Sequence, residues 1–108
     1  MIEIELFPKT GSFAEDKDIA RKIRVREIIP ALKKDNKIIL NFAKIEGTTQ
    51  SFIHALISEV MRSEGIEILD KIEFKSCAET VKSIINIVVD YMQDTLGITF
   101  GDSNTKIK

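Results

Sequence analysis

The chain has 108 residues, of which 44% are hydrophobic and 31% are charged, and its formal net charge at pH 7 is −1. This length suits a single domain with one core, and the hydrophobic content excludes a largely disordered chain. The near-neutral charge provides no general attraction to nucleic acid or to an anionic membrane surface. The longest apolar stretch, SIINIVVDYM, is interrupted by Asn86 and Asp90 and is too short to span a bilayer.

Cysteine usage and the first residues of the chain indicate a reducing compartment. Cys77 is the single cysteine, so an intramolecular disulfide is excluded. The first residues do not show the pattern of a secretory signal peptide. We therefore expect a cytoplasmic protein.

The N-terminal third of the sequence predicts a strand, a loop and an interrupted helix. Apolar and acidic residues alternate over residues 2–6, which is typical of a half-buried strand near a sheet edge. A loop is expected over residues 8–18 because it contains proline, glycine and serine. Helical spacing then continues to Lys34, with a break expected near Arg24, because Pro30 cannot lie deep inside one continuous helix.

The rest of the sequence alternates strands with helices. Residues 37–43 predict a strand, and the unbroken apolar run at its centre is typical of a strand covered on both faces. A helix over residues 49–62, a strand within residues 67–74 and a long helix over residues 78–95 follow. This order predicts an α/β fold with parallel neighbouring strands joined by right-handed crossovers.

The domain boundary is expected close to the C-terminus. Residues 1–100 form the predicted domain, and residues 98–100 would add a short last strand to it. Residues 101–108, GDSNTKIK, are polar and are predicted to form a flexible tail.

The helix predicted over residues 49–62 has the most informative polar pattern. Its apolar residues form a wide band on one side, and four polar residues fall on the other side at spacings of three and four: Ser51, His54, Ser58 and Arg62. With Thr48 or Thr49 as the N-cap, Ser51 would lie in the first turn and point away from the core. A negative charge at this position would meet free N–H groups and the positive end of the helix dipole. Ser51 therefore suits phosphorylation or contact with a partner, although a helix-capping role stays open.

The segment IILNFAKIEGTTQSFIHALISEV, which contains this helix, resembles the central segment of STAS domains, the fold of bacterial anti-anti-sigma factors. The resemblance is closer to a STAS-like family of uncharacterised bacterial proteins, in which TQSF (Thr49–Phe52) and a later F-K-x-C strand end (Phe74–Cys77) recur. It covers roughly residues 13–92 of the chain. It implies an α/β fold: a single STAS-like domain in which helices pack on a small mixed or parallel sheet.

The resemblance also assigns a role to the helix start. In anti-anti-sigma factors an Asp-Ser-Ser-Gly motif opens the corresponding helix, and an ATP-dependent anti-sigma kinase phosphorylates its second serine. By this resemblance Ser51 takes the place of that serine, Thr49 that of the motif aspartate, and Asn41 that of an aspartate at the strand end. The chain departs from the motif in lacking both aspartates and in having Phe52 at the glycine position.

The function implied by the resemblance is that of a non-catalytic regulatory domain. It would bind a histidine-kinase-like ATPase as a component of a partner switch, would be phosphorylated at Ser51 and would need no cofactor. The partner-binding surface would comprise Asn41, Lys44, Thr48, Thr49, Gln50, Ser51, His54, Ser58 and Arg62. Two alternatives stay open: a domain that senses a small molecule or nucleotide at the carboxyl ends of the strands, and an unmodified structural subunit of a bacterial assembly, including a homo-oligomer.

Other reactive side chains do not indicate a catalytic or metal site. The sequence near Ser51 and His54 lacks the glycines of a nucleophile elbow, and the chain has no second histidine. One histidine and Cys77 are too few soft ligands for zinc, and Cys77 is predicted to be a small core residue. The basic run ARKIRVR has acidic neighbours and no interleaved aromatic residues, which favours a solvated helix face over a nucleic-acid site.

Overall fold

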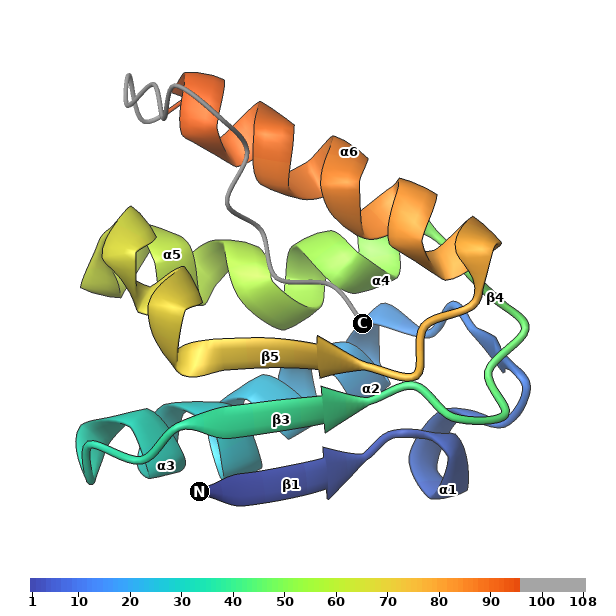
Figure 1. Ribbon diagram of the computed structural model, residues 1–108, viewed down its shortest axis with the longest axis horizontal. Coiled ribbons are helices and arrows are strands. Elements are labelled where there is room, and N and C mark those ends of the chain that lie inside the picture. Colours follow the sequence, from blue (N-terminus) through green and yellow to red (C-terminus); the bar gives the residue numbers. More distant parts are fainter. Residues whose placement is uncertain (96–108) are drawn as a thin grey trace.

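In the computed structural model, which describes residues 1–95 apart from the side chains of Ile66, Asp94 and Thr95, helices pack on two small sheets (Figure 1). One sheet contains the strands β1 (Ile2–Glu5), β3 (Ile38–Asn41) and β5 (Ile72–Lys75), and the other contains β2 (Phe13–Ala14) and β4 (Gly47–Thr48). The α-helices are α1 (Phe7–Thr10), α2 (Lys17–Ile23), α3 (Ile29–Lys33), α4 (Gln50–Ile53), α5 (Glu59–Glu64) and α6 (Glu79–Thr95). Three further helical segments are the π-helical η1 (Arg24–Ile28) and η2 (His54–Ser58) and the 3₁₀-helical η3 (Ile66–Lys71).

The larger sheet has the strand order β1-β3-β5, and both of its pairings are parallel. In this register Ile4 lies beside Leu40, and Leu40 lies beside Phe74. The predicted parallel neighbours in residues 37–43 and 67–74 are therefore confirmed, as is the position of the first strand at an edge. β2 and β4 are also parallel, so every strand pairing in the described part of the chain is parallel. Of the two predicted forms, a mixed or a parallel sheet, the structure therefore shows the parallel one.

The helices gather on one face of the larger sheet. The buried side chains of Ile4, Leu40 and Phe74 point to that face, whereas Glu3 and Ile39, which alternate with them, are exposed or half-buried. When parallel strands lie side by side in the same order as in the chain and their crossovers are right-handed, all of the crossover helices lie on the same face of the sheet. Accordingly, α2 packs against α4 and η2, and α6 packs against α4. The prediction that the central strand is covered on both faces is therefore wrong for the described elements.

The interruption predicted near Arg24 is present, but the chain stays helical through it. η1 follows α2 directly as a π-helix, in which the N–H of Ile29 donates to the carbonyl oxygen of Arg24. Pro30 then lies in the first turn of α3. A missing N–H costs least in a first turn, and the wider π-helical turn before it accommodates the proline without ending the helix.

The remaining boundaries differ from those predicted from the sequence in two places. The predicted loop over residues 8–18 contains most of α1 and all of β2. The strand expected from residue 67 begins only at Ile72, because η3 occupies the preceding residues. The long last helix is confirmed as α6, whereas the strand at residues 98–100 and the tail at 101–108 lie outside the described residues. Within the described part, none of the helices is long and apolar enough to cross a membrane.

Candidate functional site

The run of small polar residues before α4 divides its work among the individual side chains. Thr49 is the N-cap, with an extended backbone and a hydroxyl that accepts a hydrogen bond from the N–H of Phe52 at 3.1 Å. Thr48 is buried, and its hydroxyl donates to the carbonyl oxygen of Ala14 at 2.7 Å. Ser51 is exposed and makes no side-chain hydrogen bond within the described chain. Capping therefore does not explain Ser51, and its predicted position in an outward-facing first turn is confirmed.

Four of the nine predicted partner-binding residues are accessible on the helical stretch from α4 to α5, and Gln50, Ser51 and His54 form the outward face of its start. Gln50, Ser51 and Arg62 are exposed, and His54 is half-buried. The imidazole ring of His54 packs against the ring of Tyr91 on α6, with 6.2 Å between the ring centroids. This contact, rather than one with Ser51, orients the imidazole ring.

Ser58 does not belong to this face, and its predicted outward position is wrong. Its side chain is fully buried, and its hydroxyl has no hydrogen-bond partner among the described residues. The physical reason is η2: a π-helix has more residues per turn than an α-helix. The seven-residue spacing from Ser51 therefore no longer returns to the outward side, and Ser58 turns into the core.

The two π-helical segments are joined by a hydrogen bond. A guanidinium nitrogen of Arg24, from η1, donates to the carbonyl oxygen of Ala55, in η2, at 2.7 Å. Arg24 thus connects the first crossover helix to the second, and it does not form part of a free basic patch.

Asn41 and Lys44 lie in a different recess from the helix start. The Asn41 side chain donates to the Glu3 carboxylate at 2.8 Å and accepts from the N–H of Ala43 at 2.9 Å. The Lys44 ammonium lies 5.6 Å from the centroid of the Phe7 ring, and both Asn41 and Lys44 line a recess of about 160 Å³. Hydrogen bonds from Asn41 and then Lys75 lower the pKa of the Glu3 carboxyl. Because Ser51 is not among the residues that line this recess, the structure does not bring Asn41 and Lys44 together with it.

A groove between α4 and α6 borders the outward face on one side. It has a volume of about 300 Å³ and is lined by Gln50, His54, Ile87, Val88 and Tyr91. Ile87 is 47% exposed and Tyr91 is 57% exposed, which is high for large apolar or aromatic side chains. Sequence reasoning missed this groove, although Ile87 and Tyr91 could have been noticed as the residues of α6 that fall outside its main apolar stripe.

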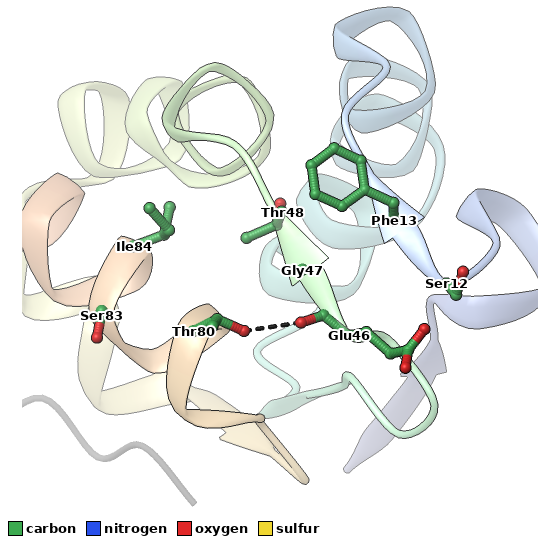
Figure 2. A pocket seen from close by; sticks show the side chains of 8 residues that line it. All are labelled: Ser12, Phe13, Glu46, Gly47, Thr48, Thr80, Ser83 and Ile84. Atoms are coloured by element: carbon green, nitrogen blue, oxygen red, sulfur yellow. Dashed lines mark hydrogen bonds between the residues drawn. The ribbon is translucent and has the colours of Figure 1, made fainter.

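A larger hollow lies between β2, β4 and the first turns of α6 (Figure 2). Its volume is about 530 Å³, and its lining residues are Ser12, Phe13, Glu46, Gly47, Thr48, Thr80, Ser83 and Ile84. The hydroxyl of Thr80 donates to the carbonyl oxygen of Glu46 at 2.7 Å across this hollow. No pattern in the sequence predicts this hollow, because its residues come from three separate segments.

The comparison that identifies the fold concerns the middle of the chain. A family described as a STAS-like domain of unknown function (DUF4325) matches residues 20–82. The chain belongs to this STAS-like family. The matched residues run from α2 to the first turn of α6 and include β3, the helix start and β5. No curated protein and no solved structure matches the chain.

The reactive groups of this STAS-like domain are separated from one another. Within residues 1–95, no three histidine, cysteine, aspartate or glutamate side chains lie close enough together to hold a metal ion. Burial raises the pKa of the Cys77 thiol to about 11, so that the group is a protonated thiol at neutral pH. Membership of the STAS-like family fits a regulatory or interaction role.

Proposed function

We propose that this STAS-like domain is a non-catalytic regulatory protein that binds a histidine-kinase-like ATPase as a component of a partner switch. The contact surface is the outward face of the helix start, formed by Gln50, Ser51 and His54, whereas the exposed Arg62 lies in α5, beyond the π-helical turn. Thr49 is the N-cap of this helix and stabilises the turn that presents the surface. Thr48 and Ser58 are excluded from it by burial, and Asn41 and Lys44 by their separate recess.

The observation that carries the proposal is that Ser51 is exposed and is not needed to cap the helix. A serine in the first turn of a helix usually serves the backbone, but Thr49 already performs that role here. The Ser51 hydroxyl is exposed and lies where N–H groups and the helix dipole favour added negative charge. A partner can therefore approach this hydroxyl without disturbing the fold.

Phosphorylation of Ser51 is the second step of the proposal. The Ser51 oxygen would attack the γ-phosphorus of ATP held by the partner, its bond to phosphorus replacing the bond to ADP, and the serine proton would pass to a base of the partner. The phosphoserine would carry a charge of about −1.5 to −2 at pH 7, and desolvating that charge would oppose further binding. Binding would thus be switched off by the modification.

Native mass spectrometry of the domain together with a histidine-kinase-like ATPase encoded by a neighbouring gene tests both steps. Without ATP, a complex of the two proteins is expected. With ATP, the intact domain should gain one phosphate, and the Ser51→Ala variant should gain none. Absence of a complex would overturn the binding step, and a phosphate on the Ser51→Ala variant would overturn the assignment of the site.

A further inference from the structure

The hollow between β2, β4 and α6 has the form of a slot with apolar walls (Figure 2). The backbone of Gly47 and Thr48 forms its floor, and the side chains of Phe13 and Ile84 stand on opposite sides of that floor. Phe13 is 50% exposed, so that its ring presents a large apolar surface without being part of the core. A ring of similar size could be received between these two walls.

The position of the Phe13 ring depends on the absence of a side chain at Gly47. A Cβ atom at position 47 would lie only 2.9 Å from a carbon of the Phe13 ring. The glycine therefore lets the ring lean over the floor of the slot. The backbone of Gly47 does not adopt a positive φ, so an alanine at this position would meet the ring without straining the main chain.

The polar groups around the slot act mainly as hydrogen-bond acceptors. A hydroxyl has one hydrogen to donate, and three of the hydroxyls donate theirs to backbone carbonyls: Thr48 to Ala14, Thr80 to Glu46, and Ser83 to Glu79. What these hydroxyls can still offer a ligand is their lone pairs. The carboxylate of Glu46, at the edge of the slot, adds acceptor oxygens and a negative charge.

We propose that this slot binds a small planar aromatic molecule that carries amino or ammonium groups. A volume of about 530 Å³ lies in the range of small-molecule sites, which combine apolar walls with a few polar groups. The aromatic ring packs between Phe13 and Ile84, and its N–H groups donate to the acceptors at the edge. Because Glu46 repels anions, the slot discriminates against phosphorylated nucleotides. The proposal is independent of Ser51 and of any protein partner.

Titration of the ¹⁵N-labelled domain with tryptamine, followed by NMR, tests the proposal. Tryptamine joins an indole ring to an ammonium group, and indole-3-propionate has the same ring and chain length with a carboxylate in its place. Saturable shifts are expected at the amides of Gly47, Thr48 and Thr80 with tryptamine, with a dissociation constant on the order of 1 mM. Indole-3-propionate should bind at least about tenfold more weakly, because its charge is reversed beside Glu46.

Two variants distinguish this slot from other apolar surfaces. Phe13→Ala should weaken tryptamine binding about tenfold or more, whereas Tyr91→Ala removes a comparably exposed aromatic ring from the α4–α6 groove and should have no effect. Gly47→Ala should also weaken binding, because it displaces the Phe13 ring. The proposal is overturned if tryptamine gives no saturable shifts at these amides, if both indoles bind equally, or if Tyr91→Ala has the larger effect.

Discussion

Replacement of Leu56 by alanine should lower the free energy of unfolding by about 3–5 kcal/mol. Leu56 lies in η2, its side chain is fully buried, and the helix around it packs against both α2 and α6. The substitution removes three carbon atoms from the core, which corresponds to about 2.4 kcal/mol at about 0.8 kcal/mol per buried CH₂ group. The cavity that the neighbouring side chains do not fill accounts for the remainder.

Urea unfolding followed by circular dichroism measures this change. A matched control is Ile87→Ala, which removes an apolar side chain that is half exposed on α6 and should change the free energy by less than about 0.5 kcal/mol. The melting temperature of Leu56→Ala should fall by roughly 12 °C or more. A Leu56→Ala variant as stable as Ile87→Ala would refute the packing described for η2.

Three further predictions concern single side chains that are buried or half-buried. Ser58→Ala should raise the free energy of unfolding by about 1 kcal/mol, because its buried hydroxyl has no partner in the part of the chain that the structure describes; a clear loss of stability would show that the hydroxyl is satisfied. Arg24→Ala should lower it by about 1–3 kcal/mol by leaving the Ala55 carbonyl without this donor, whereas the exposed Arg26→Ala should be nearly neutral; equal effects would contradict the bond. Cys77 should react with iodoacetamide at pH 8 about 100-fold more slowly in the folded than in the unfolded protein, because its pKa rises from 9.0 to about 11. Because the pKa of Cys77 is higher in the folded than in the unfolded protein, the contribution of this group to stability is fully present below pH 9 and is lost as the pH rises toward 11. Equal alkylation rates in the folded and unfolded protein would refute the burial of the thiol.

The parallel pairing of β3 with β5 was predictable because its signals are local. Alternation in residues 2–6, an apolar run near residue 38 and a glycine-bounded helix between two strands each appear within a few residues. Together they require parallel strands and right-handed crossovers. What these signals could not supply is how many faces the helices cover, since that depends on the order of the strands in space.

The register of the central helix was not predictable, because it depends on η2. A period of 3.6 residues places Ser58 beside Ser51 and His54, but the wider π-helical turn moves it into the core. The break near Arg24 was predictable only because Pro30 marks it in the sequence. η2 contains neither proline nor glycine, so no comparable local signal marks it.

Some features of the candidate site were likewise predictable from the sequence, and others were not. The cap at Thr49 and the exposure of Ser51 follow from helix-start chemistry and were predictable. The contact between His54 and Tyr91 and the slot beside Phe13 join segments that are far apart in the chain, and they could be found only in the folded structure.

The most direct test of the proposed function is a calorimetric titration of a histidine-kinase-like ATPase with the Ser51→Asp variant. The control is Ser63→Asp, which places the same charge on an exposed serine at the far end of the same helical stretch. Both variants should remain folded in thermal melts. We predict that Ser51→Asp weakens binding at least about tenfold, because a charge must be desolvated where a neutral hydroxyl docks, and that Ser63→Asp binds like the wild type. Wild-type affinity of the Ser51→Asp variant would contradict the assignment of this helix start as the partner-binding surface.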